Sequence, residues 1–370
     1  MTDDARRHLM RSVLQRVATG PELSKSINFD EARDVMTSIL DGDADPVQAG
    51  VFLIALRMKR ETDDELKGVL QALRDRTTSC ESAVDDVVDF VDPYDGFNRN
   101  LLVSPFVPAV LAACGVAAFS HGVYSVGPKY GATHAQVLSA AGVDVGRSPA
   151  DVAIRLEDAS IGWGYVDQAR FSPKLFGLVE LRERIVKRPA LTTVEVLTGP
   201  ITGRQTHLVT GYVHKPYPRI YAMLARHAGF DSCLLVRGIE GGTTPSMRQN
   251  AKVWRYQSGG EESDTDIEPM LFGIEQPSRG VPLPDGLDGY RKKNEVDGVQ
   301  VDADAIAKAS AAAGFAALEG SKGAARDAIT YATALVLWHL GRADDFGMAA
   351  AKVRSVLDDG SAKARLLAGR

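Results

Sequence analysis

A change in the hydrophobic pattern near residue 83 constrains the fold of this chain more than any other feature. Before this point, apolar residues recur at the spacing of amphipathic helices. After it, short apolar runs such as residues 87–91 alternate with helical stretches. This alternation predicts an α/β domain with a mostly parallel sheet flanked by helices. We therefore expect a small helical domain at residues 1–80 and a larger α/β domain at residues 81–370.

Three local motifs predict where helices begin in the first domain. Asn28 with Glu31, and Thr62 with Glu65, have the spacing of a capping box. In that motif an N-cap side chain and a carboxylate three residues later satisfy each other's free backbone amides. Asp45 precedes a proline and suits an N-cap, because proline's missing N–H costs nothing at the first helical position.

The expected strands bring two loops to one edge of the sheet. The candidate strands are residues 87–91, 116–119, 162–166, 208–213 and 233–236. Ligands of such sheets bind at the carboxyl ends of the strands. The loops that begin at Asp92 and His121 are therefore expected to form a binding site. Residues 257–300 indicate exposed loops and short strands.

Composition excludes several classes of protein. The net charge of −5 gives no overall attraction to nucleic acid or acidic membranes. The three cysteines are scattered without a C-x-x-C pair, which argues against a disulfide framework and a cysteine zinc site. No run of about 18 apolar residues occurs, and the first residues lack a signal peptide's apolar run. We expect no membrane span and a cytoplasmic location.

Several segments, taken in order along the chain, resemble one enzyme family. They are residues 45–60, His121-Gly122 with Ser125-Val126, Lys129 and Gly131, residues 197–202, and Gly320, Gly323 and Arg326-Asp327-Ala328. The last two resemble the patterns L-L-G-P-L-T and G-x-x-G-x-x-R-D-A. The ordered set resembles the anthranilate phosphoribosyltransferases, also called glycosyltransferase family 3.

The resemblance implies a fold of the nucleoside phosphorylase and phosphoribosyltransferase type. It implies that a segment near residues 166–190 joins the helical domain, and that the helical parts form a homodimer. Family members join anthranilate to phosphoribosyl pyrophosphate (PRPP) with magnesium and release pyrophosphate. Such chemistry needs mainly charge neutralisation and positioning. The expected ligand is a phosphorylated sugar or another anion, with Mg²⁺ as cofactor.

The same resemblance gives candidate site residues. Those for substrate and phosphate binding are Asp95, Gly96, Ser104, His121, Lys129 and Arg182. Asp95 and Glu240 are candidate magnesium ligands, because Mg²⁺ prefers oxygen. Ser104 would bind phosphate with its hydroxyl at a helix N-terminus. Arg182 would bind the acceptor carboxylate with its planar guanidinium.

Each of four candidates also has a structural interpretation. Ser104 precedes a proline and suits a plain N-cap. Lys129 is also typical of a solvated loop lysine, and Arg182 of a surface arginine on a charged helix. His121, a lone histidine beside glycine, is also typical of a structural hydrogen-bond partner.

Two motifs depart from the family. Its first loop, G-T-G-G-D-G, is replaced by the shorter Asp92-Pro93-Tyr94-Asp95-Gly96. Proline removes a donor N–H, and Asp92 adds negative charge where phosphate is expected. The family's magnesium-binding Asp-Glu pair is replaced by Thr243-Thr244. These losses leave open whether the chain is an active enzyme.

Phosphoribosyl transfer to an aromatic acceptor therefore has two alternatives. Residues 170–188, the basic block, carry six positive charges against two negative ones. With Arg57, Lys59 and Arg60, the block suggests a basic cleft between the domains, and hence a non-catalytic nucleic-acid-binding protein. The other alternative is nucleoside phosphorylase-like activity, since pyrimidine nucleoside phosphorylases share the K-H-G-N-R-x-x-S-S-K-S-G loop. Val123-Tyr124 replaces the Asn-Arg pair of that loop.

Overall fold

The computed structural model describes residues 2–20, 22–290 and 301–370, and the chain begins with a helical bundle. Its helices are α1 (Asp3–Val17), α2 (Phe29–Asp41), α3 (Pro46–Lys59) and α4 (Asp63–Arg74). The capping boxes predicted at Asn28 and Thr62 are confirmed, with both reciprocal hydrogen bonds present in each. Asp45 caps α3 as predicted, and Pro46 occupies the first turn. Local side-chain chemistry thus sets where these helices begin.

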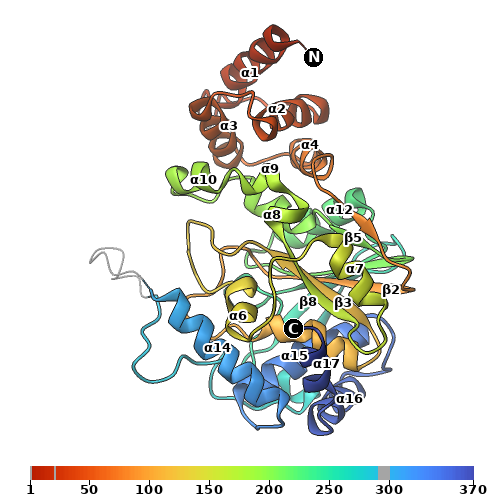
Figure 1. Cartoon of the computed structure of the whole chain (residues 1–370). Coiled ribbons are helices and arrows are strands. Elements are labelled where there is room, and N and C mark those ends of the chain that lie inside the picture. The colour runs from red at the N-terminus through yellow and green to blue at the C-terminus, as the bar shows by residue number, and fades with distance from the viewer. Residues whose placement is uncertain (1, 21, 291–300) are drawn as a thin grey trace.

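Short helices from the middle of the chain lie beside this bundle. They are α8 (Gln168–Phe171), which packs against the sheet, and α9 (Pro173–Phe176), α10 (Val179–Ile185) and α11 (Leu191–Val194), which pack against the bundle. Leu175, Leu191 and Val194 are buried in the same apolar cluster as the cores of α2, α3 and α4. In Figure 1, α8, α9 and α10 lie between the bundle at the top and the sheet below it. The domain boundary at residue 80 and the inserted segment at residues 166–190 stay predictions.

The larger unit is built on a seven-stranded sheet in the order β4-β3-β2-β6-β7-β8-β9. The strands are β2 (Asp86–Val91), β3 (Ala117–Gly122), β4 (Trp163–Asp167), β6 (Gln205–Gly211), β7 (Ser232–Val236), β8 (Ala251–Tyr256) and β9 (Ser263–Ile267). The first five in this order run parallel, and β8 and β9 are antiparallel. A separate parallel pair joins β1 (Cys80–Glu81) to β5 (Ile201–Thr202). The predicted α/β class with a mostly parallel sheet is confirmed.

The five predicted strands correspond to the five parallel strands of this sheet. The sequence did not predict β8. The strand β9 falls within residues 257–300, where short strands were expected, and residues 291–300 lie outside the described residues.

Helices cover the faces of the sheet. They are α5 (Val107–Ala113), α6 (His134–Ala140), α7 (Pro149–Glu157), α12 (Tyr217–Ala228), α14 (Ala303–Leu318), α15 (Ala324–His339), α16 (Phe346–Asp358) and α17 (Ser361–Ala368). The helices α14 to α17 lie at the bottom of Figure 1, away from the helical bundle. Along α15, Tyr331 and Leu335 are fully buried in the largest apolar cluster. Within the described ranges, no helix has the length and apolar character needed to cross a bilayer.

Candidate functional site

A cavity of about 120 Å³ lies where the helical unit meets the carboxyl ends of β2 and β6. We call it the interdomain cleft. Its lining includes Arg57 of α3, Arg188, Tyr212 and His214, and Tyr217 and Tyr221 of α12. Its volume is of the order of the ~150 Å³ that admits benzene in an engineered protein cavity. The cleft is therefore of the size that suits a single-ring molecule.

Asp92 follows β2 directly, and its buried side chain gathers donors from three separate segments. Its carboxylate accepts the Ser104 hydroxyl, His134 Nε2 at 2.9 Å and the Thr243 backbone N–H at 2.7 Å. Burial alone would raise the pKa of Asp92, but these hydrogen bonds and the charge of His134 outweigh it and lower the pKa. The carboxylate thus takes a hydroxyl and an amide of the kind that would otherwise bind phosphate.

Ser104, a predicted phosphate ligand, begins the 3₁₀ turn η1 (Ser104–Phe106) and makes no capping hydrogen bond. The plain N-cap interpretation is therefore wrong, because the hydroxyl is directed to Asp92 instead. Its oxygen also lies 3.4 Å from His134 Nε2. Phosphate binding by Ser104 stays a prediction, and it would require the carboxylate of Asp92 to leave.

Asp95 and Gly96 hold the first loop against the second. The buried carboxylate of Asp95 accepts hydrogen bonds from Arg188 Nε at 2.9 Å and Nη2 at 2.6 Å. Gly96 has φ 73°, and a Cβ built there would lie 2.4 Å from the carbonyl oxygen of Ala132. Glycine is therefore needed for the close approach of the two loops. A ligand contact of either residue stays a prediction.

Glu240 lies in the 3₁₀ turn η3 (Ile239–Gly241), with φ 52°. One carboxylate oxygen lies 2.5 Å from Lys129 Nζ, and the backbone N–H groups of Asn98 and Arg99 donate to the carboxylate at 3.1 and 2.9 Å. Burial would raise the pKa of Glu240, but Lys129 and these donors lower it. The solvated-lysine interpretation of Lys129 is wrong, since its side chain is 13% exposed and ion-paired. Phosphate binding by Lys129 stays a prediction.

Arg182 lies inside the helical unit. Its Nη1 and Nη2 donate to the two carboxylate oxygens of Glu195 at 2.6 and 2.8 Å, and both side chains are 1% exposed. Burial raises the pKa of Glu195, although Arg182 acts against this rise. The surface-arginine interpretation is wrong, because the pair is buried. Recognition of an acceptor carboxylate by Arg182 stays a prediction. In this structure the Nη1 and Nη2 groups of Arg182 donate to the carboxylate of Glu195 instead.

His121 is the penultimate residue of β3 and makes a row of buried polar contacts. Its Nε2 lies 3.0 Å from a carboxylate oxygen of Asp89, and its Nδ1 contacts the Tyr94 hydroxyl. Its ring packs edge-on against Phe171, with the centroids 5.4 Å apart. These contacts are those of a structural hydrogen-bond partner, one of the two interpretations from the sequence. Contact of His121 with a bound substrate stays a prediction.

The arrangement does not fit magnesium binding by Asp95 and Glu240. Each carboxylate already faces a cationic side chain, Arg188 and Lys129 respectively. In residues 2–20, 22–290 and 301–370, no group of three or more His, Cys, Asp or Glu side chains is placed to hold a metal ion. Mg²⁺ needs several hard oxygen ligands around it, and the hydroxyls at Thr243-Thr244 carry no charge.

The basic cleft suggested by the sequence is not assembled. Within the basic block, Arg182 is buried, while Lys174 and Arg184 face acidic side chains of α2 and α10. Arg57 and Arg188 are the members of the predicted set that line the interdomain cleft. Ion pairs neutralise several of the positive charges that were predicted to form this cleft. The structure therefore gives no support to the nucleic-acid alternative.

The aromatic wall of the cleft was not predicted from the sequence. Tyr217 accepts a hydrogen bond from Arg57 Nη1 at 2.5 Å, and Tyr221 follows one helical turn later on the same face. The signal was present in the run His214-Lys215-Pro216-Tyr217-Pro218, which closely follows a predicted strand. Residues directly after a parallel strand reach the ligand-binding edge of the sheet.

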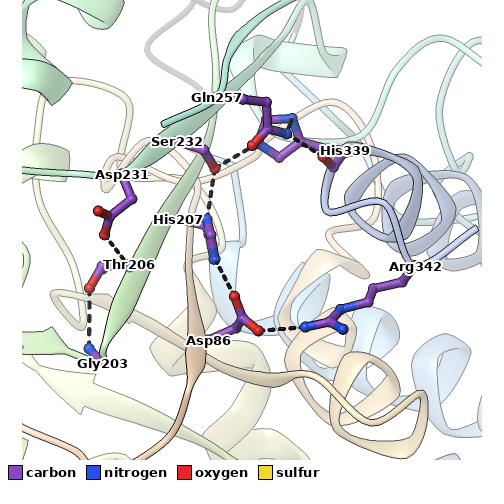
Figure 2. A network of polar contacts seen from close by, with 9 residues as sticks. All are labelled: Asp86, Gly203, Thr206, His207, Asp231, Ser232, Gln257, His339 and Arg342. Atoms are coloured by element: carbon purple, nitrogen blue, oxygen red, sulfur yellow. Dashed lines mark hydrogen bonds and ion pairs between the residues drawn. The ribbon is translucent and has the colours of Figure 1, made fainter. Parts of the chain in front are cut away.

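A second polar network occupies the opposite edge of the sheet (Figure 2). His207 Nε2 lies 2.9 Å from Asp86, and its Nδ1 lies 2.8 Å from the Ser232 hydroxyl oxygen. That oxygen also lies 2.9 Å from His339 Nε2. The order of acid, imidazole and hydroxyl resembles a nucleophilic triad. Ser232 is 1% exposed and held between two imidazoles, so the network is structural.

Family comparisons agree with the geometry. The helical bundle domain of a glycosyl transferase family matches residues 11–77, and the α/β domain of that family matches residues 95–283. An anthranilate phosphoribosyltransferase from Rhodopseudomonas palustris is 28% identical over 365 residues, which cover 96% of each chain. An uncharacterized protein of Aquifex aeolicus is 28% identical over 253 residues, covering 68% of this chain and 74% of that one.

Solved structures share the whole architecture. Anthranilate phosphoribosyltransferase from Thermus thermophilus is 20% identical, with a TM-score of 0.73 over 98% of both chains. The enzyme from Saccharomyces cerevisiae, in complex with PRPP and Mg, is 15% identical, with a TM-score of 0.75 over 98% of this chain and 97% of that one. The chain therefore belongs to the glycosyl transferase family that includes the anthranilate phosphoribosyltransferases.

Proposed function

We propose that the interdomain cleft binds a single-ring aromatic carboxylate. The observation that carries this proposal is a ring-sized cavity with tyrosines and arginines in its wall. Arg188 gives Nε and Nη2 to Asp95 and keeps the N–H groups of Nη1 for a ligand carboxylate. Its side chain is 51% exposed, whereas that of Arg182 is 1% exposed. The aromatic wall suits a ring.

We assign a phosphorylated sugar to the same edge of the sheet, as the donor of a pentosyl group. The yeast relative binds PRPP with Mg. In the corresponding transfer, the acceptor nitrogen would bond to the anomeric carbon while the bond to the leaving phosphate breaks, and the nitrogen would give up one proton to water. The charge of the leaving group then needs cations. Since Asp95 and Glu240 do not fit magnesium, this proposal gives that task to arginine and lysine side chains.

A binding titration tests the proposal. Anthranilate and benzoate would be titrated into the protein by calorimetry, with magnesium and with a chelator, and we expect equal affinity in both. Arg188→Gln should weaken binding roughly tenfold, the order expected for a lost charged hydrogen bond. Arg184→Gln is the matched control, because Arg184 is an exposed arginine of the same segment and pairs with Glu180. Absence of binding, or binding that requires magnesium, would contradict the proposal.

Turnover is measured separately. Anthranilate fluorescence and phosphate or pyrophosphate release would be followed with PRPP, with and without magnesium. We expect that any turnover survives chelation. Turnover that needs magnesium would contradict the assignment of charge neutralisation to arginine and lysine side chains.

We also propose a homodimer through the apolar groove between α3 and α10. Val47 and Val51 are 73% and 42% exposed, and Ile54 and Leu181 line the same groove. Exposed apolar patches of this kind mark association surfaces. Light scattering should give the mass of a dimer, and Val51→Glu should give that of a monomer. A monomeric wild type would contradict the proposal. The cytoplasmic location stays a prediction.

A further inference from the structure

We propose that Tyr221 and Arg57 recognise a hydroxyl group on the ring of the ligand in the interdomain cleft. Both residues line this cavity, Arg57 from α3 and Tyr221 from α12. This contact rests on the proposed function, since it adds to the ring whose carboxylate Arg188 would bind. It makes the ligand an aromatic hydroxy acid, whichever atom of the ring is joined to the sugar.

The hydroxyl of Tyr221 is a polar group without a partner in the wall of the cleft. Tyr221 is 8% exposed, and its hydroxyl makes no hydrogen bond to any of the described residues. Burial raises the pKa of Tyr221, so the hydroxyl keeps its proton at neutral pH. A buried hydroxyl that lacks a partner costs free energy, which a hydrogen bond to a ligand would recover.

Two arginines act on this hydroxyl from different parts of the chain. Arg57 and Arg188 both lower the pKa of Tyr221 against the effect of burial, so both positive charges lie near its oxygen. The ring of Tyr217 lies 5.8 Å from that of Tyr221, and its hydroxyl oxygen lies 2.5 Å from Arg57 Nη1. A ring whose carboxylate binds Arg188 would therefore lie near both Tyr221 and Arg57.

The guanidinium of Arg57 is held in place by side-chain contacts. Its Nη1 donates to Tyr217 and lies 3.8 Å from a carboxylate oxygen of Glu61, and its central carbon lies 5.8 Å from the centroid of the Tyr217 ring. Across the described part of the chain, the guanidinium makes no other hydrogen bond. A guanidinium has five N–H groups, so donors remain for a ligand. A donor that is already fixed loses little entropy when a ligand binds.

The balance of charge around the cleft favours a neutral hydroxyl over a second carboxylate. The cationic side chains here already face acids, in the pairs Arg188–Asp95, Lys129–Glu240 and Arg57–Glu61. The carboxylate of the ligand adds one negative charge to this set. A second carboxylate would lose its water without a further cation to balance it, which is costly. A hydroxyl can accept from Arg57 and also exchange a hydrogen bond with Tyr221.

Calorimetry with benzoate, 3-hydroxybenzoate and 4-hydroxybenzoate tests this contact. We expect at least one hydroxybenzoate to bind roughly tenfold more tightly than benzoate, the order expected for one hydrogen bond to a charged group. A site that bonds a ligand hydroxyl discriminates against the analogue that lacks it, because its own polar groups are then left unpaired. Tyr221→Phe and Arg57→Gln should each remove most of this difference, because both ligands then bind without the hydroxyl contact.

Two variants are matched controls. Tyr165→Phe removes the hydroxyl of another buried tyrosine, which has no hydrogen-bond partner within the described ranges and does not line the cleft. Arg60→Gln removes an exposed arginine that directly follows α3 and does not line the cleft either. Both controls should keep the full difference in affinity between hydroxybenzoate and benzoate.

Several results would overturn the inference. Benzoate that binds as tightly as both hydroxybenzoates would exclude the hydroxyl contact and leave the proposed function standing. A difference that is also lost in Tyr165→Phe would be a general effect of packing. Isophthalate, the 1,3-dicarboxylate, would assign Arg57 to a second anionic group if it bound more tightly than 3-hydroxybenzoate. If no aromatic acid binds, the proposed function fails together with this contact.

Discussion

The two edges of the central sheet carry similar polar side chains and differ in what lies beside them. At the amino edge, Ser232 and His207 belong to a buried row of hydrogen bonds (Figure 2). At the carboxyl edge, Asp95 and Glu240 are paired just as fully. The difference is that the carboxyl edge adjoins the interdomain cleft, and Arg188 is half exposed in it.

This difference teaches that reactive residue types do not by themselves define a site. The amino edge has the order of acid, imidazole and hydroxyl, yet a substrate has no approach to the Ser232 hydroxyl, because that side chain is fully buried. At the carboxyl edge, the Ser104 hydroxyl that was expected to bind phosphate is directed to the carboxylate of Asp92, and Lys129 is paired with Glu240. Arg188, which lines the cleft and is half exposed, keeps donors for a ligand.

The largest expected effect comes from the buried ion pair of Arg182 and Glu195. Glu195→Ala should destabilise the protein by about 3–5 kcal/mol, because it leaves the charge of Arg182 buried without a partner. Denaturant unfolding measures this. Glu180→Ala is the matched control, since Glu180 pairs with Arg184 on the same helix with both side chains more than 70% exposed. That change should cost about 0–1 kcal/mol. Equal effects of the two variants would mean that the ion pair of Arg182 and Glu195 does not stabilise the fold more than an exposed pair does.

The helix starts and the parallel strands were predictable because they depend on neighbours in sequence. A capping box such as that of Asn28 needs a carboxylate three residues away, and a buried strand such as β2 shows as a short run of Val and Phe interrupted by Asp89. The strand β8 contains Lys252 and Arg255 without a regular alternation and lies near the edge of the sheet, so its sequence carries a weaker signal.

The site was less predictable because its pairs join distant segments. Asp92 meets Thr243, which lies 151 positions away, and Asp95 meets Arg188, which lies 93 positions away. The family pattern placed Ser104 at a phosphate and gave no sign that a carboxylate would fill that place. Only the folded structure shows which acidic and basic side chains form ion pairs.

Replacing Asp92 tests how far its hydrogen bonds stabilise the loops at the carboxyl edge of the sheet. Asp92→Asn should destabilise the protein by about 2–3 kcal/mol, because charged hydrogen bonds to Ser104, His134 and Thr243 are weakened. The pKa of Asp92 is lowered in the folded chain, so its contribution is present above its ordinary value of 3.8 and is lost as the pH falls through the folded pKa. The stability gap between wild type and variant should therefore close below about pH 4. A gap that persists at low pH would refute the role of the charge.

The free energy of unfolding should also depend on pH through His339, which belongs to the network at the amino edge. Burial, with Arg255 and His207 adding to it, lowers the pKa of His339 from 6.5 to about 3. The unfolded chain therefore takes up a proton below pH 6.5 that the folded chain refuses until about pH 3, so stability falls across this window. The slope is at most about 1.4 kcal/mol per pH unit. His339→Gln should flatten the unfolding free energy between pH 7 and 4, whereas an unchanged slope would assign the dependence to other groups.

Ser232→Ala should give the smallest effect and the sharpest contrast between the two edges. The hydroxyl lies between His207 Nδ1 and His339 Nε2, at 2.8 and 2.9 Å, so its loss should cost about 1–2 kcal/mol of unfolding free energy. Ser160→Ala, at an exposed turn, is the control and should stay within about 0.5 kcal/mol of the wild type. Benzoate affinity should be unchanged in both variants, because neither serine lines the cleft. A changed benzoate affinity for Ser232→Ala would show that the amino edge is coupled to the carboxyl edge, and the two edges could then not be treated as separate.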